Sequence, residues 1–414
     1  MEETLVNDDS RGVVRPVTPN AGPLAGVRIL DLTTVVMGPS ATRILADLGA
    51  DVIKVESPNG DTMRWIGPDR SPGMGPLYLQ SNHNKRSIRL DLKTEEDLAA
   101  LRSLIPTVDV IVTNVRPAGM TRLGLDYDGI RDLNDSIIYC SAVGYGTSGP
   151  ESGKAVYDDL MQAASGIADL FGQVDGEPRY APINLCDRIV GNYLVIGIIA
   201  ALYHRLATGE GQFVEVPMFE TMAQFVLADH IGGEAFVPAA GEMGYRRLLS
   251  RTRRPYPTKD GHIAVVVYSN KHWQAFSAFL GIDDLTQSDP RFASQDSRTV
   301  HAEEIGTFLS EQFTSRTTGE WLDILATIDI PASPVNSVRD LLDDPHLRDI
   351  EFFQEREHPT EGTLRVSRFP IDFEKSPATL SRLAPTLGEH NSELLGGADR
   401  AATPSRELAD EVTA

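Results

Sequence analysis

A regular alternation of strand and helix patterns between residues 27 and 143 constrains the fold more than any other feature of this sequence. Residues 27–32 form an apolar run typical of a buried strand, residues 41–48 have a helical pattern that Gly49 can end, and residues 51–56 form a second apolar run. A strand, a helix and a second strand in this order favour a right-handed unit with parallel strands.

The same pattern continues further along the chain. We expect strands at residues 87–92, 108–114, 137–143 and 213–216, and helices at residues 95–105, 127–133 and 189–206. Strands that alternate with helices in this way predict an α/β fold with a doubly wound, mostly parallel sheet.

A second, smaller α/β domain is expected to be inserted into the first. Residues rich in Gly, Arg and Pro precede it, and it contains a predicted strand at 262–267, a helix at 271–280 and helices across 300–328. The predicted division is a flexible segment at 1–22, a large Rossmann-like domain at 23–229, a linker or loop at 230–257, the small domain at 258–346, a return to the large domain at 347–397 and a flexible tail at 398–414.

The composition excludes several classes of protein. A net charge of −21 opposes binding to nucleic-acid phosphates, which requires clustered Lys and Arg. The only cysteines, Cys140 and Cys186, lie in apolar stretches and cannot form a disulfide framework or a CxxC metal site. The first residues carry acids where a signal peptide has bases, and the longest apolar run, 193–203, is short for a membrane span. We therefore expect a cytoplasmic protein without nucleic-acid or membrane partners.

The common nucleotide and hydrolase motifs do not occur. The turn after the first predicted strand has one glycine and no GxGxxG, and no GxxxxGK[ST] is present. The segment GYGTSGP at 144–150 has Pro150 where the GxSxG motif needs its last glycine. No HExxH occurs and the histidines are scattered, so no metal is expected.

Several segments, taken together and in order, resemble the family III CoA-transferases of the formyl-CoA transferase (CaiB/BaiF) type. They include PLAGVRILDLTTVVMGPSATRILADLGADVIKVE from residue 23, NHNKRSIRLDLK at 82–93, VIVTNVRPAGMTRLGLDY at 110–127, VYDDLMQAASG at 156–166, NLCDRIVGNYLVIGIIAAL at 184–202, and the late RRPYPTKDGHI and LGEHN. The resemblance extends from about residue 23 to residue 395.

The resemblance implies an interlaced homodimer and a reaction that moves CoA from an acyl-CoA to a carboxylic-acid acceptor. An aspartate attacks the thioester and forms a mixed anhydride, and the CoA thiolate then converts the enzyme into an aspartyl-CoA thioester. No permanently bound cofactor and no metal is implied; coenzyme A and acyl-CoA are substrates.

Asp187, in NLCDRIVG, stands at the position of the family's nucleophile. It precedes the long apolar helical pattern, so we expect the helix dipole and free N–H groups to keep its carboxylate ionised. The alternative from the local sequence is that Asp187 is only a helix N-cap, which is a common role for Asp at such a place.

Tyr157 and Asp158 discriminate between related activities. The α-methylacyl-CoA racemases, which also belong to this family, carry His at the position of Tyr157 as a second acid/base, because racemisation removes and delivers protons on opposite faces. Tyrosine is a poor substitute near neutral pH. Tyr157 could instead hydrogen-bond the acyl group, and we expect Asp158 to orient the site.

Basic residues matching the family pattern are the candidates for contacts with CoA phosphates, which prefer Arg, Lys or helix N-terminal amides. The full set of expected CoA and acyl contacts is Val36, Met37, Lys85, Arg86, Asn114, Arg116 and Arg122. Formyl-CoA transferases have Gln at the position of Val36, which puts a small, doubly charged acceptor such as oxalate in doubt.

The glycine-rich loop of the formyl-CoA transferases is not reproduced; residues 232–247, which include Arg246 and Arg247, occupy that region. These two arginines, with Arg253 and Arg254, could meet an acceptor carboxylate or a CoA phosphate, or lie in an interface. Two other functions stay open. One is an α-methylacyl-CoA racemase or carnitine-dehydratase-like enzyme, and the other is a CoA-ester-binding protein that has lost activity.

Overall fold

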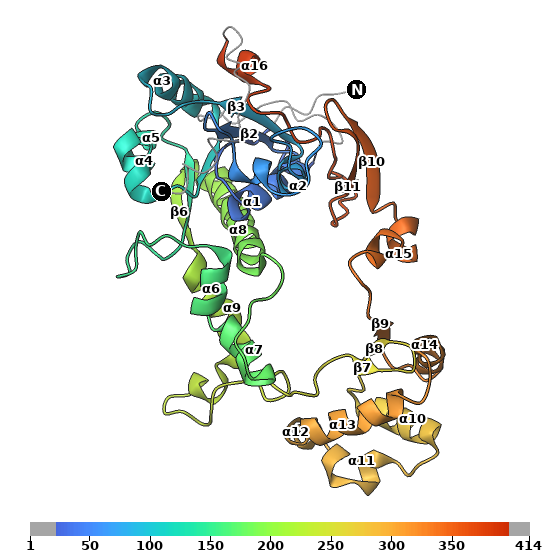
Figure 1. Ribbon diagram of the computed structural model, residues 1–414. Coiled ribbons are helices and arrows are strands. Elements are labelled where there is room, and N and C mark those ends of the chain that lie inside the picture. Colours follow the sequence, from blue (N-terminus) through green and yellow to red (C-terminus); the bar gives the residue numbers. More distant parts are fainter. Residues whose placement is uncertain (1–21, 397–414) are drawn as a thin grey trace. The chain divides into compact units, whose positions relative to one another are not determined.

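The computed structural model describes residues 22–396, which separate into two compact units (Figure 1). Unit 1 contains the described residues up to Ser165, then Ala181–Ala223, then the chain from Asp349 onward. Unit 2 contains Gly166–Tyr180 and Gln224–Arg348. Each unit has its own core, and each is described separately.

Unit 1 is built on a six-stranded parallel sheet with the strand order β3-β2-β1-β4-β5-β6. This is the doubly wound order, in which the direction of winding reverses between β1 and β4. The strands are β1 (Arg28–Leu32), β2 (Asp51–Glu56), β3 (Lys85–Arg89), β4 (Val110–Thr113), β5 (Ile138–Val143) and β6 (Gln212–Pro217).

Helices flank this sheet, and a large apolar core lies between them and the strands. The helices are α1 (Met37–Asp47), α2 (Pro76–Asn82), α3 (Glu95–Leu104), α4 (Pro117–Leu123), α5 (Tyr127–Arg131), α6 (Asp158–Ala164), α8 (Leu185–Thr208) and α16 (Asn391–Leu395). Helix α9 (Met218–His230) begins in unit 1 and continues into unit 2. A hairpin of β10 (Phe353–His358) and β11 (Gly362–Ser367) follows in the C-terminal part.

The long helix α8 packs against α1. A Cβ atom at Gly191 would lie 3.0 Å from the main-chain oxygen of Met37, so glycine allows the two helices to approach closely. Helix α8 is long and apolar enough to cross a membrane by length and composition alone. The continuous apolar run within it, residues 193–203, is shorter than the helix. Its inner face, which includes Val190, Leu194 and Ile198, is fully buried in unit 1, as in the core helix of a globular domain.

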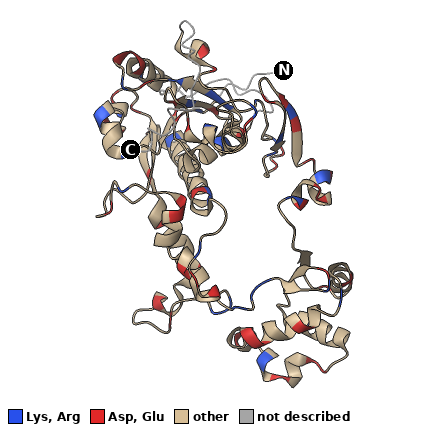
Figure 2. Cartoon of the chain, in the orientation of Figure 1, with Lys and Arg blue, Asp and Glu red and all other residues tan. Residues whose placement is uncertain are grey.

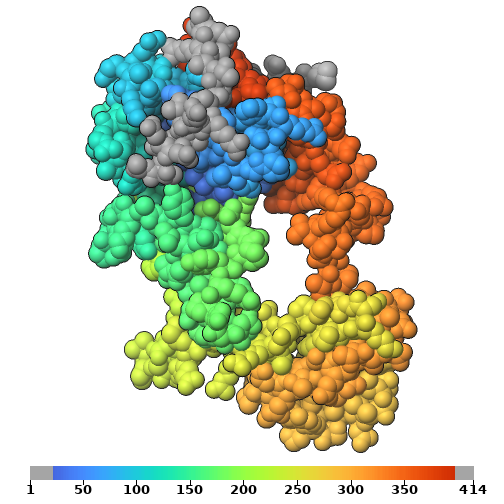
Figure 3. Space-filling view, in the orientation of Figure 1, coloured from blue at the N-terminus to red at the C-terminus, as the bar shows by residue number. Residues whose placement is uncertain are grey.

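Unit 2 has a three-stranded antiparallel sheet, β7 (Tyr256–Pro257), β8 (His262–Val265) and β9 (Ala332–Pro334), in that order. Its aromatic core contains Trp273 and Trp321. Figure 3 shows the residues from β7 to β9, in yellow to orange, packed into one body. The helices of this unit are α7 (Ile167–Asp175), α10 (Asn270–Leu280), α11 (Leu285–Ser288), α12 (Gln295–Val300), α13 (Ala302–Phe313), α14 (Thr318–Thr327) and, at its end, α15 (Pro345–Asp349).

The predicted α/β class and the parallel, doubly wound sheet are confirmed. The helix predicted at 41–48 begins earlier, at Met37, because Gly38-Pro39-Ser40 lies in the first turn of α1, where proline needs no N–H partner.

The main segment of unit 2 begins after Ala223 and ends at Arg348, whereas the predicted boundaries were after residues 229 and 346. Residues 166–180 belong to unit 2, whereas the sequence assigned them to the large domain. Of the two segments predicted to be flexible, 1–22 and 398–414, all but residue 22 lie outside the described residues.

Candidate active site

A cavity of about 380 Å³ lies in unit 1 beyond the carboxyl ends of β1, β4 and β5. Ligands of doubly wound sheets bind at this edge, where the strand order reverses. Residues that line the cavity include Thr34, Val35 and Met37 after β1, Asn114 and Arg116 after β4, Tyr145 and Thr147 after β5, Lys154 and Tyr157 before α6, Asp187 in α8, and Met218.

Asp187 lines this cavity from the first turn of α8. It is the third residue of the helix, and Asn184 occupies the N-cap position, so Asp187 is not the N-cap that the local sequence suggested. Among the described residues, no side chain or backbone N–H donates a hydrogen bond to its carboxylate. The carboxylate therefore faces the cavity without a protein partner.

The electrostatic environment of Asp187 differs from the expectation. Burial and the nearby charge of Asp158 raise the pKa of Asp187 to about 7, while Arg188 acts in the opposite direction. The predicted stabilisation of the ionised form by the helix end is wrong, because desolvation and a like charge outweigh it. Near neutral pH a substantial fraction of Asp187 is protonated.

Asp158 fixes the start of α8 from a neighbouring helix. One of its carboxylate oxygens accepts the backbone N–H of Asp187 at 2.9 Å, so it satisfies one of the free N–H groups at the helix end. The other oxygen accepts the side-chain amide of Gln162 at 2.6 Å. Gln162 in turn accepts the N–H of Ala181 at 2.8 Å, which ties the chain leading into α8 to helix α6.

Tyr157 stands immediately before α6, at its N-cap position, and its side chain is 56% exposed. It lines the same cavity as Asp187, and its hydroxyl has no hydrogen-bond partner among the described residues. The hydroxyl is therefore free to donate to a bound group.

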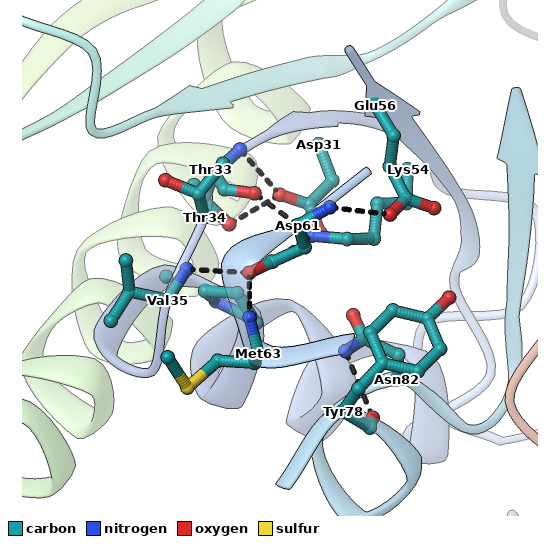
Figure 4. Close-up of polar contacts among 12 residues, drawn as sticks. Asp31, Thr33, Thr34, Val35, Lys54, Glu56, Asp61, Met63, Tyr78 and Asn82 are labelled. Carbon is teal, nitrogen blue, oxygen red and sulfur yellow. Dashed lines mark hydrogen bonds and ion pairs between the residues drawn. The ribbon is translucent and has the colours of Figure 1, made fainter. Parts of the chain in front are cut away.

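The turn after β1 forms another wall of the cavity, and two neighbours hold its backbone. Val35 has a positive φ of 72°, which is strained for a β-branched residue. Its N–H donates to a carboxylate oxygen of Asp61 at 3.1 Å, as Figure 4 shows. The Asn114 side chain accepts the N–H of Thr34 at 3.0 Å and donates to the carbonyl of Thr34 at 2.9 Å.

A buried network of charges lies beneath this turn (Figure 4). The Lys54 ammonium donates to Asp61 and to the carbonyl of Thr33, both at 2.9 Å, and its side chain and that of Asp61 are fully buried. Glu56 accepts the backbone N–H of Asp61 at 3.1 Å and forms an ion pair with Arg64 at 2.7 Å. Sequence reasoning missed this network, because Lys54 and Glu56 appeared only as residues of a predicted strand.

A further wall comes from the loop after β5. Glu220 accepts the N–H of Gly146 at 2.8 Å, and Glu215 accepts the N–H and the hydroxyl of Thr147 at 3.0 and 2.6 Å. From the sequence alone, residues 144–150 of this loop were recognised only as an incomplete GxSxG motif. Its place directly after a predicted strand was the signal that could have assigned it to the site.

Three of the residues predicted to bind CoA or the acyl group line the cavity: Met37, Asn114 and Arg116. Val36 is 3% exposed and does not line it; Val35 and Met37 on either side do. The guanidinium of Arg116 has no ion-pair partner among the described residues, so it is available to a ligand.

The other predicted basic contacts lie outside the cavity lining. Lys85 is fully buried and donates to Asp31 at 3.1 Å and to two further oxygens. Arg86 forms ion pairs with Asp51 at 2.5 Å and with Glu393 at 2.6 Å. Arg122 is exposed on α4. The partners of Lys85 and Arg86 indicate a structural role for both side chains.

Comparison with known proteins adds to this geometry. The model of CoA-transferase family III matches residues 24–391. The chain belongs to CoA-transferase family III. It is therefore an enzyme that transfers CoA between carboxylic acids.

Two curated relatives and one solved structure illustrate the similarity. The succinate–glutarate CoA-transferase of Agrobacterium fabrum is 32% identical over 92% of this chain and 98% of its own. The succinyl-CoA:mesaconate CoA-transferase of Haloarcula marismortui is 33% identical over 90% of this chain and 96% of its own. The crystal structure of a CaiB/BaiF family protein from Brucella suis has a TM-score of 0.77 and 30% identity, over 91% of this chain and 99% of that one.

Within the described residues, no group of His, Cys, Asp and Glu is arranged to hold a metal ion. Both cysteines are buried, and burial raises the pKa of each thiol to about 12, so neither is a thiolate nucleophile near neutral pH. Among the described residues that line the cavity, Asp187 is the one carboxylate.

Proposed function

We propose that Asp187 is the nucleophile of this CoA-transferase. Its carboxylate oxygen attacks the thioester carbonyl of the donor, the C–S bond breaks, and CoA leaves as a thiolate. The thiolate then attacks the aspartyl carbonyl of the mixed anhydride, and the donor acid leaves as a carboxylate. The acceptor carboxylate attacks the resulting aspartyl-CoA thioester, and the released thiolate takes the acceptor's acyl group and frees Asp187.

The observation that carries this proposal is the unpaired carboxylate of Asp187 in the cavity, with its pKa raised to about 7 by burial and by Asp158. A desolvated carboxylate with a higher pKa is a stronger nucleophile once it is ionised. Each step exchanges one activated acyl bond for another, and no step needs net proton transfer. A second acid/base partner is therefore unnecessary.

Trapping the covalent intermediate tests the mechanism. Hydroxylamine added to enzyme and acyl-CoA should convert Asp187 to a hydroxamate, detected by mass spectrometry of the peptide that contains it. Asp187→Ala should prevent both the label and CoA exchange. Full exchange activity in this variant, or a label on a different residue, would contradict the proposal.

The racemase alternative has a separate test. Proton exchange at the α-carbon needs two titrating groups near the substrate, and none of the described cavity-lining residues is a histidine. Deuterium incorporation into a 2-methylacyl-CoA in the absence of any acceptor acid would favour a racemase. We expect no incorporation. CoA binding without turnover across a broad panel of acids would instead favour a protein that has lost activity.

We propose short dicarboxylic acids as the substrate class. The relatives from Agrobacterium fabrum and Haloarcula marismortui are named for succinate, glutarate and mesaconate. Lys154, which lines the cavity and forms an ion pair with Glu151, could hold an anionic group remote from the reacting carbon. Mass spectrometry of the products formed from mixed acyl-CoAs and a panel of mono- and dicarboxylates would identify the pair. Exchange restricted to monocarboxylates would contradict this choice.

We propose that Met37, Asn114, Arg116 and Arg122 contribute to CoA binding, with Arg116 on a phosphate. Arg116→Gln should raise the KM for the acyl-CoA about tenfold, as expected for one lost charge-assisted contact, and leave the KM for the acceptor nearly unchanged. A raised KM for the acceptor with an unchanged KM for the acyl-CoA would instead indicate that Arg116 binds the acceptor.

We propose that the protein forms the interlaced homodimer implied by its family. Ile196, Ile199, Tyr203 and Leu206 lie on one exposed face of α8, with Tyr203 and Leu206 75% and 85% exposed. An apolar stripe of this kind marks a surface that is covered in the assembly. Light scattering should give the mass of two chains. A monomer would exclude the dimer, and vesicle binding by wild type but not by Leu206→Asp would assign the stripe to membranes instead.

A further inference from the structure

Unit 2 contains a cavity of about 390 Å³ that the proposed reaction does not use. All of its lining residues belong to unit 2. One wall is the segment that leads into β7, where Figure 2 shows basic residues, and the others come from β8 and from helices α10, α12 and α13.

The lining of this cavity is strongly basic. It contains Arg247, Arg253, Arg254 and Arg298, and neither aspartate nor glutamate is among the lining residues. The whole chain has 59 acidic and 38 basic residues, so this cavity carries the opposite charge to the protein as a whole. Such a concentration of guanidinium groups favours anions.

Arg298 has no counterion among the described residues, although its side chain is half-buried. Two of its nitrogens donate to the carbonyl of Phe292 at 2.6 Å and to the side chain of Gln295 at 3.3 Å, and its Nε has no partner. Burial lowers the pKa of Arg298 because the charged form is incompletely solvated. A buried charge of this kind is stabilised by an opposite charge.

Arg291 provides a contrast within the same unit. It forms ion pairs with Asp289 at 2.7 Å and with Glu304 at 3.3 Å, so its charge is fully compensated by the protein. Arg298 lies seven positions further along the chain, and no described carboxylate pairs with it. Within one stretch of this unit, the charge of Arg291 is thus compensated by carboxylates and that of the cavity-lining Arg298 is not.

The other basic groups are also available. The guanidinium of Arg253 has no hydrogen bond or ion pair with described residues, and that of Arg247 lies over the Tyr268 ring at 6.0 Å. The indole N–H of Trp273, a lining residue that is 1% exposed, has no acceptor. Hydrogen-bond donors outnumber acceptors around this space. The remaining lining combines apolar and aromatic residues, such as Leu309 and Tyr256, with the polar Ser250, Thr252, Gln295 and Thr299.

We propose that this cavity binds a multiply charged organic anion. Arg247, Arg253, Arg254 and Arg298 hold its carboxylate or phosphate groups, and its less polar part packs against Tyr256, Leu309 and their neighbours. This site lies in a different unit from Asp187 and does not depend on the proposed catalytic role of that residue.

Calorimetric titration of the full-length chain tests the proposal, at an ionic strength near 0.15 M and with saturating CoA to fill the catalytic site. Citrate, pyrophosphate and adenosine 3′,5′-bisphosphate are the probes, because they separate a carboxylate ligand, a bare phosphate and a phosphate with an aromatic part. We expect at least one probe to bind with one site per chain. No binding by any probe, or binding only in the absence of CoA, would overturn the proposal.

Variants locate the site. Arg298→Gln and Arg253→Gln should each weaken the probe about tenfold or more, the usual loss for one charge-assisted contact. Arg348→Gln is the matched control, because it removes the same charge from a side chain of unit 2 that is 67% exposed and outside the cavity lining. If Arg298→Gln does not fold, Arg253→Gln still decides, since that side chain has no described partner. Equal affinity of all variants for the probe would exclude this cavity as the binding site.

Discussion

Two cavities of this protein are nearly equal in size, about 380 Å³ in unit 1 and about 390 Å³ in unit 2, but they differ in the partly buried charge that lines them. In unit 1 this is the carboxylate of Asp187, and in unit 2 it is the guanidinium of Arg298; neither has an oppositely charged partner within hydrogen-bond distance among the described residues. Other charges do have partners, such as Lys54 with Asp61 and Arg291 with Asp289.

The comparison separates two uses of the same physical effect. Desolvation raises the pKa of Asp187 and lowers the pKa of Arg298, in both cases because the charged form has lost water without gaining an opposite charge. For the carboxylate of Asp187 we propose a nucleophilic role. An arginine has no such chemistry, so we infer binding. Unpaired and paired charges should therefore respond differently to substitution.

The largest effect is expected at Asp187. Asp187→Asn keeps the shape of the side chain and removes the nucleophilic oxygen, so kcat/KM for CoA exchange should fall by at least about 10³-fold. Steady-state exchange assays measure it. Asp159→Asn is the control, since Asp159 is exposed on the same helix as Asp158 and is not a cavity-lining residue. A comparable loss of kcat/KM in Asp159→Asn would mean that the loss in Asp187→Asn is not specific to the cavity carboxylate.

Removing a paired, buried charge should instead destabilise the fold. Lys54→Met removes the ion pair with Asp61 and the positive charge that stabilises the ionised form of Asp31. The free energy of unfolding should fall by about 3–5 kcal/mol. Lys271→Met breaks an exposed ion pair with Asp329 and should change it by less than about 1 kcal/mol. Urea unfolding measures both. Similar changes would mean that the buried network contributes no more than a surface pair.

The unpaired charge of Asp187 should cost stability at high pH. Its folded pKa is raised from 3.8 to about 7, so the folded state binds the proton more tightly and stability is lost as pH rises through this range. Asp187→Asn should therefore be more stable than wild type at pH 8, by an amount on the order of a few kcal/mol, and equal to it below pH ~4. Thermal unfolding at both pH values checks this. A variant less stable than wild type at pH 8 would contradict the raised pKa.

The smallest predicted effect concerns Asp158. Its charge contributes to the raised pKa of Asp187, so Asp158→Asn should move the acidic limb of the kcat/KM profile to lower pH. The variant retains an oxygen that can accept the N–H of Asp187. Activity should fall toward acid pH in both proteins, because Asp187 must be ionised to attack. An unmoved acidic limb would assign the titration to another group.

Much of the fold could be predicted from the sequence. The alternation of strands and helices between residues 27 and 143 depends on local periodicity, and the strand Asp51–Glu56 was predicted with its observed limits. The position of Asp187 before an apolar helix, together with the family resemblance, made it the nucleophile candidate. That role, the homodimer and the cytoplasmic location stay predictions until they are measured.

The roles of individual charged side chains were much harder to predict. Lys85 was expected to bind CoA, yet it is buried against Asp31, and Lys54 was not singled out although it holds the turn that lines the cavity. The sequence gives the type of a charged residue but not its partner. Ion pairs such as Arg64 with Glu56 form only where the folded backbone places the two side chains close together.

The sequence by itself therefore determined the α/β class, the parallel sheet and the likeness to one family of enzymes, since these depend on local pattern and on residue order. Only the tertiary structure decided which charges are compensated. Burial by neighbouring elements raises the pKa of Asp187, against the effect expected from the helix end alone, and Arg298, which lines an arginine-rich cavity, has no counterion among the described residues. Desolvation depends on everything packed around a group, and it can reverse what the adjacent residues suggest.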